Sequence, residues 1–345
     1  MTRVAINGFG RIGRTFFRMA FEHPDFEIVA INDLGDLENL AYLLRYDTAY
    51  GRSGFEVEVK DNNVLVVNGK EISFSQIRDP LTLPWKALDI DVVLEATGVF
   101  AGYAKSKVHL EAGAKRVVIS APVKDDPVAA GVDGATVLMG VNEDDLNTCS
   151  ITSNASCTTN ATSPLVSILK AGIGIEKALL NTVHAYTSTQ AIVDGPDKDF
   201  RKGRAAAQNI IPTSTGAAIA TTLVHPDLAG KFDGIAMRVP VPVGSIVDVT
   251  FVASRETTVE EVNKILKDAA ESKAWQKLFA VTEDEIVSSD IIGARYASIA
   301  DLAFTRVVGG NLVKVLAWYD NETSYTHTLV EHIAAISRFL SRKES

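Results

Sequence analysis

The sequence is poor in cysteine, in long apolar runs and in positive charge, and each shortage excludes a class of protein. Only Cys149 and Cys157 occur among 345 residues, and nothing pairs them as the disulfide framework of a small secreted protein. No stretch approaches the ~18 apolar residues that a membrane span requires. Met1 leads into strand-like sequence rather than a secretory signal. We therefore expect a cytoplasmic protein without a membrane anchor.

The charge and composition narrow the class further. A net charge of −9 argues against nucleic acid as the primary partner, although a local basic pocket could still hold a small anion. With 46% hydrophobic and 22% charged residues, the chain has the composition of a soluble globular protein, and its length suits about two domains. No metal site is predicted.

A glycine-rich turn follows the first predicted strand. Residues 3–7 form a short apolar strand, the turn Gly8-Phe-Gly-Arg-Ile-Gly13 follows, and residues 14–22 have the apolar spacing of a helix. In this order the glycines let the backbone approach a pyrophosphate held at the helix N-terminus. The turn predicts a dinucleotide site made by Gly8, Gly10, Arg11, Ile12 and Gly13.

Asp33 ends the second predicted strand, residues 27–32, about twenty residues beyond the last glycine of the turn. A carboxylate at this place hydrogen-bonds the adenosine ribose hydroxyls and repels a 2′-phosphate, so NAD is predicted rather than NADP. The alternative is that Asp33 is only a turn residue.

Further apolar strands are predicted at residues 91–98 and 116–121, and strands at 137–142 and 150–152 complete the first sheet. Ligands of open α/β sheets lie at the carboxyl ends of the strands. We therefore expect the cofactor crevice to be lined by Thr97, Gly98 and Ser120.

Cys157 begins a predicted helix that ends at the Gly172 stop, directly after the short strand 150–152. A helix N-terminus favours the thiolate form of a cysteine. The alternative is a small buried hydrophobe, but hydrogen-bonding residues flank Cys157 where a core cysteine would have apolar neighbours. Cys157 is therefore a candidate nucleophile.

The segment Ser153-Asn-Ala-Ser-Cys-Thr-Thr-Asn160 resembles the active-site signature of the phosphorylating glyceraldehyde-3-phosphate dehydrogenase family, and the resemblance covers essentially the whole chain. It implies an α/β fold in which a Rossmann-type NAD-binding domain, residues 1–156 plus 322–345, is joined to an α+β catalytic domain with a mixed sheet, residues 157–321. The C-terminal helix would return to the NAD-binding domain. Residues of about 186–208 resemble the family's S-loop, which crosses a subunit interface and implies a homotetramer.

The same resemblance implies a mechanism. His184, in a His-x-Tyr-Thr sequence, would be the base, although a lone histidine ordinarily has no catalytic role. The Cys157 thiolate would attack glyceraldehyde 3-phosphate, hydride would pass to NAD, and inorganic phosphate would resolve the thioester to 1,3-bisphosphoglycerate. The substrate phosphate would contact Thr187 and Arg238. The attacking phosphate would contact Ser156, Thr158, Thr215 and Gly216, with Arg201 or Arg204 contributing.

Four more residues are assigned from the resemblance. Asn321 resembles the residue that hydrogen-bonds the nicotinamide carboxamide, with Tyr325 packed nearby; a polar cap before the last helix is the alternative. Arg78 resembles an adenine-side loop arginine, although a solvated loop charge explains it almost equally well. Pro196 matches the pattern of NAD-preferring members.

The chain departs from the family pattern at three places. Ala161 stands where many relatives have a second cysteine, and Thr189 stands where some carry an aspartate near the substrate phosphate. The pair Thr323-Ser324 replaces a bulkier aromatic and glycine pair. These departures bear on fine substrate contacts.

Three other functions compete with this one. Erythrose-4-phosphate dehydrogenase shares the fold and the cysteine but would have a loop less suited to phosphate than residues 213–216. A cysteine acyltransferase or hydrolase would need neither Asp33 nor the glycine-rich turn. A non-enzymatic interaction protein on the same fold would tolerate the loss of Cys157 or His184, and both are present.

Overall fold

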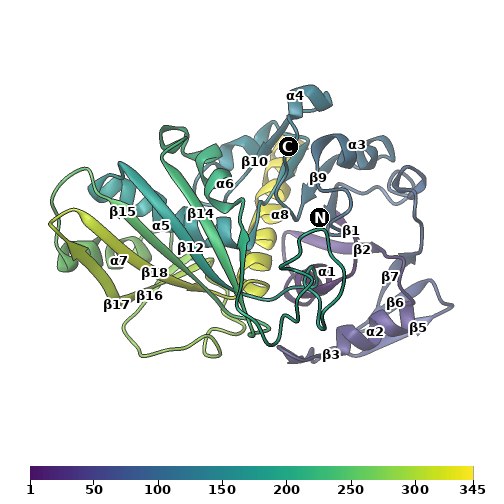
Figure 1. The fold of residues 1–345 in the computed structure, drawn as a ribbon. Coiled ribbons are helices and arrows are strands. Elements are labelled where there is room, and N and C mark those ends of the chain that lie inside the picture. Colours follow the sequence, from purple (N-terminus) through teal and green to yellow (C-terminus); the bar gives the residue numbers. More distant parts are fainter. Residues whose placement is uncertain (345) are drawn as a thin grey trace. The chain divides into compact units, whose positions relative to one another are not determined.

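The computed structural model describes residues 1–344, with side chains described through residue 341. Packing divides the chain into two compact units (Figure 1). The first contains Met1–Ala155 and the chain from Thr326 onward, and the second contains Ser156–Tyr325. Among the described residues, none of the helices is both long and apolar enough to cross a membrane.

The first unit is built on a nine-stranded sheet in the order β10-β11-β9-β8-β1-β2-β7-β6-β5. Strand β1 pairs in parallel with β2 on one side and with β8 on the other, so the topological switch point lies at its carboxyl end. Strands β5, β6 and β7 form an antiparallel extension. The strands of this sheet are β1 (Thr2–Asn7), β2 (Phe26–Asn32), β5 (Val57–Lys60), β6 (Val64–Val67), β7 (Lys70–Ser75), β8 (Val92–Glu95), β9 (Arg116–Ile119), β10 (Gly134–Thr136) and β11 (Ile151–Ser153).

Helices and a small hairpin complete the first unit. The α-helices are α1 (Arg11–Ala20), α2 (Leu37–Arg45), α3 (Tyr103–Glu111), α4 (Pro127–Ala130) and most of α8 (Thr323–Glu344), the 3-10 helices are η1 (Pro80–Thr82) and η2 (Glu143–Asn147), and the hairpin strands are β3 (Tyr46–Asp47) and β4 (Gly51–Arg52).

The glycine-rich turn joins β1 to α1 through two different kinds of glycine. Gly8 has φ +99°, a conformation that other residues rarely adopt. A Cβ on Gly13 would lie 2.1 Å from the carbonyl oxygen of Gly8, so only glycine lets α1 approach β1 this closely. Phe16 and Phe17 then bury the inner face of α1.

The prediction of a strand at residues 137–142 is wrong. The edge strand is β10, Gly134–Thr136, which pairs with β11, and the chain leaves the sheet directly after it. The side chain of Asn142 closes a turn there, because its Oδ1 accepts from Leu138 N and its Nδ2 donates to the Thr136 carbonyl, each at 2.9 Å. Val137 is apolar and buried in this turn, which explains why the sequence resembles a strand.

The second unit is built on a seven-stranded mixed sheet in the order β13-β14-β12-β15-β18-β17-β16. Strands β12 and β14 are parallel, as are β16 and β17, and the other neighbours are antiparallel. The strands are β12 (Lys177–Ala185), β13 (Ile211–Ser214), β14 (Phe232–Val239), β15 (Ser245–Val252), β16 (Phe279–Thr282), β17 (Ser298–Val308) and β18 (Leu312–Tyr319), and the helices are α5 (Cys157–Ile173), α6 (Ala217–Val224), η3 (Pro226–Leu228) and α7 (Val259–Glu271).

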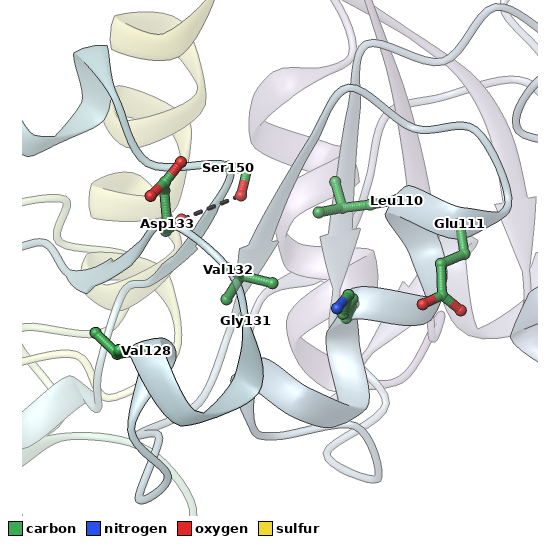
Figure 2. Close-up of a pocket in the computed structure, with 8 residues that line it drawn as sticks. Leu110, Glu111, Val128, Gly131, Val132, Asp133 and Ser150 are labelled. Atoms are coloured by element: carbon green, nitrogen blue, oxygen red, sulfur yellow. Dashed lines mark hydrogen bonds between the residues drawn. The ribbon is translucent and has the colours of Figure 1, made fainter.

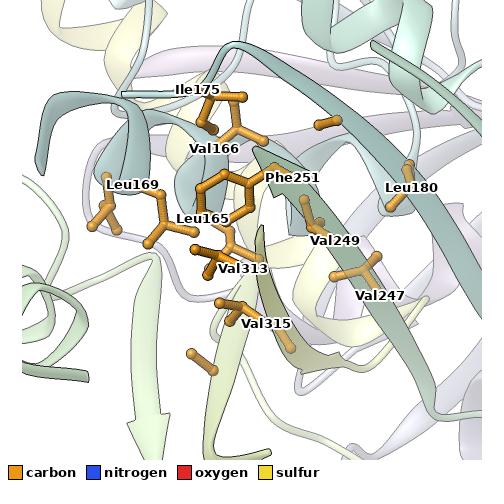
Figure 3. Close-up of a cluster of buried hydrophobic side chains, with 14 of the residues drawn as sticks. Leu165, Val166, Leu169, Ile175, Leu180, Val247, Val249, Phe251, Val313 and Val315 are labelled. Atoms are coloured by element: carbon orange, nitrogen blue, oxygen red, sulfur yellow. The ribbon is translucent and has the colours of Figure 1, made fainter. Parts of the chain in front are cut away.

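The core of this unit lies between the sheet and helix α5. Every second residue of β15 is buried, as the two-residue period of a strand requires. Figure 3 shows Val249 and Phe251 of β15 together with Val313 of β18 beside Leu165 and Leu169 of α5. This packing fixes α5, and with it the position of Cys157, on the sheet.

We expect Gly13→Ala to destabilise the first unit, because the added Cβ would push α1 away from β1. Overpacking of this kind costs about 1–3 kcal/mol. Thermal unfolding followed by circular dichroism, without added cofactor, should show a lower midpoint. Gly10→Ala is the matched control, since a Cβ there meets no atom within 4 Å. Equal midpoint losses in the two variants would contradict the packing explanation.

Candidate active site

A cavity of about 350 Å³ in the first unit borders the carboxyl ends of β1, β2 and β8. Five predicted cofactor residues line it: Gly8, Gly10, Asp33, Arg78 and Thr97. The rest of its wall is formed by Asn7, Asn32, Leu34, Ile77, Pro80, Ala96, Val99 and Phe100.

Some of the predicted cofactor residues do not line this cavity. Arg11 directs its guanidinium to Asp47, with Nη1 2.5 Å from Oδ2. Gly13 packs against Gly8, as described above. The residues outside the cavity wall are Arg11, Ile12, Gly13, Gly98, Ser120, Asn321 and Tyr325.

The carboxylate of Asp33 accepts hydrogen bonds from two backbone amides, one of which belongs to the glycine-rich turn. Its Oδ2 accepts from Phe9 N at 2.6 Å, and its Oδ1 accepts from Gly35 N at 2.7 Å. The carboxylate therefore links the end of β2 to the turn after β1 while it lines the cavity. This geometry presents a fixed negative charge to a ligand.

Glu95, a buried residue at the end of β8 that bonds residues of the cavity wall, was not predicted from the sequence. Its carboxylate accepts from Asn7 Nδ2 at 2.6 Å and from Thr97 N at 2.8 Å, and it contacts His109 Nε2 at 3.0 Å. Asn7 in turn accepts from Asn32 Nδ2 at 2.8 Å. The available signal was that Asn7, Asn32 and Glu95 are polar residues ending apolar strands.

A larger hollow of about 590 Å³ lies elsewhere in the first unit, beside α3 and α4 (Figure 2). Asp133 and Ser150 border it, and Ser150 Oγ donates to the Asp133 carbonyl at 3.1 Å. None of the predicted site residues lines it. Size alone therefore does not identify the cofactor site.

Cys157 is the first residue of α5, and Ser156 caps this helix by accepting from Thr159 N at 3.1 Å. The preceding residue, Ala155, is buried and has φ +54°, which is unusual for a residue other than glycine. The Ser153 hydroxyl accepts from Ala155 N at 3.0 Å and helps to hold this conformation.

The segment before Cys157 is anchored on α8 within the first unit. His332 Nδ1 donates to Asn154 Oδ1 at 3.2 Å, and its Nε2 accepts from the Thr152 hydroxyl at 2.8 Å. Asn154 Nδ2 also donates to Thr328 Oγ1 at 2.9 Å. Burial lowers the pKa of His332 to about 3, so the imidazole is neutral near pH 7.

His184 of β12 lies beside the thiol, with its Nε2 3.3 Å from Cys157 Sγ. On its other side, Nδ1 lies 2.8 Å from Nη1 of Arg238 and 2.6 Å from the Ala185 carbonyl oxygen. Parallel pairing of β12 with β14 puts His184 and Arg238 opposite each other. The second unit thus brings together the three residues Cys157, His184 and Arg238.

The surroundings favour the neutral forms of both reactive groups. Burial and the Arg238 charge lower the pKa of His184 to about 3. Burial raises the pKa of the Cys157 thiol, and the Arg238 charge opposes that increase. A thiol and a neutral imidazole therefore face each other at this contact.

Tyr319 of β18 supports this cluster and was not singled out from the sequence. Its hydroxyl contacts Thr158 Oγ1 at 2.9 Å and Thr182 Oγ1 at 2.8 Å. Its ring meets the His184 ring edge-on, with 5.9 Å between centroids. The Thr158 hydroxyl, predicted to contact phosphate, is thus already bonded to Tyr319.

The other predicted phosphate residues lie on several elements of the second unit. Thr187 follows β12 and contacts Thr189 Oγ1 at 2.9 Å, and Gly216 is the N-cap of α6. Thr215 Oγ1 accepts from Ala217 N at 3.2 Å, and Ser156 Oγ contacts Thr159 Oγ1 at 2.7 Å. On the S-loop, Arg204 Nε is 3.0 Å from Asp194 Oδ2, and Arg201 is exposed.

Asn321 and the positions that depart from the family pattern have structural roles. Asn321 Oδ1 accepts from Gly244 N at 3.0 Å. Ala161 is buried in the core between α5 and the sheet. At the start of α8, Thr323 N donates to Asp320 Oδ1 at 2.8 Å and Ser324 Oγ donates to the Asp320 carbonyl at 2.5 Å. Tyr325 is buried.

Two family models match the chain. The model described as the NAD binding domain of glyceraldehyde 3-phosphate dehydrogenase matches residues 2–103. The model described as the C-terminal domain of glyceraldehyde 3-phosphate dehydrogenase matches residues 156–321. The second match begins one residue before Cys157.

Curated relatives are similar over almost their full length. Glyceraldehyde-3-phosphate dehydrogenase of Geobacillus stearothermophilus is 49% identical over 97% of this chain and 98% of that protein. The protein of the same name from Clostridium pasteurianum is 49% identical over 98% of this chain and 100% of its own. Glyceraldehyde-3-phosphate dehydrogenase 1 of Bacillus subtilis is 47% identical over 97% and 98%, respectively.

We expect the His332 site to make the protein less stable in acid. Its pKa of about 3 in the folded state is below the ordinary 6.5, so at pH below 6.5 the unfolded chain binds a proton that the folded chain does not. This one group should therefore reduce the free energy of unfolding by roughly 1.4 kcal/mol per pH unit as the pH falls from about 6.5 to about 3. Urea unfolding at several pH values should show a shallower dependence for His332→Gln. Identical slopes for the two proteins would refute the assignment.

Proposed function

Because this chain belongs to the glyceraldehyde-3-phosphate dehydrogenase family, we propose that it oxidises glyceraldehyde 3-phosphate with NAD and inorganic phosphate to 1,3-bisphosphoglycerate, reversibly. The observation that carries this proposal is the 3.3 Å contact between Cys157 Sγ and His184 Nε2 at the N-terminus of α5. This arrangement suits covalent catalysis through a thioester. We take the two units as the cofactor-binding domain, to which α8 returns, and the catalytic domain.

Cys157 and His184 carry the acyl transfer. His184 Nε2 takes the thiol proton, and the thiolate adds to the aldehyde carbon. Nε2 returns the proton to the developing alkoxide, which gives the thiohemiacetal, and removes it again as hydride leaves. The product of these steps is a thioester on Cys157. A phosphate oxygen then attacks the thioester carbonyl and the Cys157 sulfur departs.

The cavity of the first unit fits the adenosine and pyrophosphate parts of NAD, which supplies the hydride acceptor when bound. Gly10 leaves the space beside its Cα open, as the approach of a pyrophosphate requires. Asp33 lines the cavity with a carboxylate that suits ribose hydroxyls and repels a 2′-phosphate. Arg78 lines the same cavity, and Pro196 on the S-loop agrees with a preference for NAD.

Two sites would hold phosphate groups. Arg238 and Thr187 are assigned to the phosphate of the substrate, since a guanidinium matches phosphate oxygens. Inorganic phosphate is assigned to the N-termini of α5 and α6, where backbone N–H groups favour anions. Of the two S-loop arginines, Arg201 is the better candidate, because Arg204 is paired with Asp194. The residues of the inorganic phosphate site are Ser156, Thr158, Thr215 and Gly216.

The remaining assignments extend the proposal. Asn321 and Tyr325 would serve the nicotinamide end of the cofactor, with Asn321 held in place through Gly244. Two unpaired cysteines, Cys149 and Cys157, suit a reducing cytoplasm.

The proposal predicts that turnover depends on both Cys157 and phosphate. NADH formation from NAD and glyceraldehyde 3-phosphate should be sustained only with phosphate or arsenate, because each of these oxyanions can resolve the thioester. Cys157→Ser should lose turnover by at least about a thousandfold and still bind NAD in a titration of protein fluorescence. Cys149→Ser is the matched control and should remain active. Equal turnover without phosphate would assign the chain to the erythrose-4-phosphate type.

We also propose that the protein is a homotetramer, because the second sheet has an apolar face that is exposed in one chain. Leu179, Ile235 and Leu312 are 67%, 50% and 43% exposed, and strand register puts them on the face opposite to Phe251 and the helices. An apolar face of this kind marks a protein interface. A second copy of the chain would cover it.

The double variant Leu179→Lys and Ile235→Lys should therefore assemble less. Sedimentation analysis should show a tetramer for the natural sequence and smaller species for the variant, because two charges would be buried without partners. Val128→Lys, an exposed apolar position on α4, is the control. A tetramer that survives the double substitution would exclude this face as an interface.

A further inference from the structure

The Nδ1 atom of His184 has two neighbours with opposite requirements. Arg238 Nη1 lies 2.8 Å from it, and a guanidinium can only donate a hydrogen bond. The Ala185 carbonyl oxygen lies 2.6 Å from it, and a carbonyl can only accept. Nδ1 therefore accepts from Arg238 in one tautomer and donates to Ala185 in the other.

Arg238 and Ala185 are also bonded to each other. Arg238 Nη1 donates to the Ala185 carbonyl at 2.9 Å, so the two hydrogens of this nitrogen reach both Nδ1 and the carbonyl. The carbonyl is thus an acceptor that either the arginine or the histidine can use. If Arg238 moves away, Nδ1–H has a partner already in position.

The tautomer decides what Nε2 can do for the thiol. With Arg238 donating to Nδ1, the ring proton is on Nε2, which then has no lone pair to take the proton of Cys157. With Nδ1–H bonded to Ala185, Nε2 can accept that proton across the 3.3 Å contact. An imidazolium, which carries protons on both nitrogens, cannot coexist with Arg238 in its present place.

We propose that Arg238 locks His184 in its inactive tautomer and that the phosphate of the substrate releases the lock by drawing the guanidinium away. This inference rests on the proposed function, which assigns Arg238 to the substrate phosphate. It adds a positioning role: the arginine couples binding of the phosphate to formation of the thiolate. The thiol is then activated only when an aldehyde with a phosphate group is bound.

The proton balance of the release is simple. The neutral ring loses its Nε2 proton to water and takes a proton from water on Nδ1, and the Ala185 carbonyl oxygen accepts the resulting hydrogen bond. Cys157 then passes its thiol proton to Nε2, which gives a thiolate and an imidazolium. The step needs no oxidant, reductant or further group.

Three side chains bring charged or titratable groups to the His184 ring within the second unit. They are Cys157 from α5, Arg238 from β14 and Tyr319 from β18, whose hydroxyl is bonded to Thr158 and Thr182. Burial raises the pKa of Tyr319, so it stays neutral.

The charge of Arg238 acts on both groups of the Cys157–His184 pair. Its charge lowers the pKa of His184 and also that of Cys157. The guanidinium also bonds Nδ1 directly, so in its present place it blocks protonation of the ring at that atom. Release of the arginine therefore favours the ion pair.

The test measures the reactivity of Cys157 without turnover. In a Cys149→Ser background, which leaves one thiol, the rate of alkylation by iodoacetamide is followed against pH. The probe is sn-glycerol 3-phosphate, which carries the phosphate but has no aldehyde. We expect the probe to lower the pH midpoint of alkylation by about one unit or more, and Arg238→Ala to have a low midpoint that the probe does not move.

Several outcomes would overturn the lock. One is a midpoint that the probe leaves unchanged in the enzyme with Arg238, provided that the probe is shown to bind by competition with glyceraldehyde 3-phosphate. Another is a raised midpoint in Arg238→Ala, which would mean that the arginine only stabilises the thiolate. Arg255→Ala is the matched control, because Arg255 is exposed and paired with Glu261 at 2.7 Å; its midpoint should respond to the probe as the parent does.

The alkylation and turnover experiments can reject the lock without rejecting the proposed function, and the function without rejecting the lock. Phosphate-dependent NADH formation together with an unmoved midpoint would reject the lock alone. A midpoint that moves as expected in a protein without that turnover would reject the function alone. If Arg238→Ala does not fold, as judged by circular dichroism, the effect of the probe on the parent protein still decides.

Discussion

The second unit depends on one buried imidazole whose two nitrogens face different partners. His184 meets the Cys157 thiol through Nε2 and meets Arg238 and the Ala185 carbonyl through Nδ1. These contacts require that β12 and β14 pair in the observed register and that helix α5 packs with Cys157 beside His184. The core between the sheet and α5, against which Cys157 itself packs, holds these elements together, so apolar packing positions the thiol.

The segment that leads into Cys157 shows how buried polar groups hold a chain segment in one conformation. Thr152 and Asn154 are anchored by His332 of α8, and Ala155 keeps a left-handed conformation just before the helix. Buried polar groups are costly unless paired, so such a network specifies one arrangement. Within the first unit, the C-terminal helix thereby holds the segment that ends at Ala155.

At the carboxyl edge of the first sheet, hydrogen bonds between buried polar residues again hold the strand ends in one arrangement. Asn32, Asn7 and Glu95 end three adjacent strands and are linked by hydrogen bonds, and Asn7 and Asn32 line the cavity. The glycines of the turn have different roles: Gly13, outside the cavity wall, lets α1 pack closely, and Gly10, which lines the cavity, leaves the space beside its Cα open. Topology brings these residues together, because parallel strands end at one edge.

The sequence alone determined the glycine-rich turn and the helix that starts at Cys157, since these follow from glycine spacing and apolar periodicity, and the two kinds of sheet followed from the family resemblance. It failed at residues 137–142, where Asn142 closes a turn over apolar residues that resemble a strand. Only the tertiary structure decided that Tyr319 and Glu95 support the sites and that Arg238 bonds His184. Local sequence carries propensity and pattern, whereas contacts between residues far apart in the chain arise when the sheets assemble.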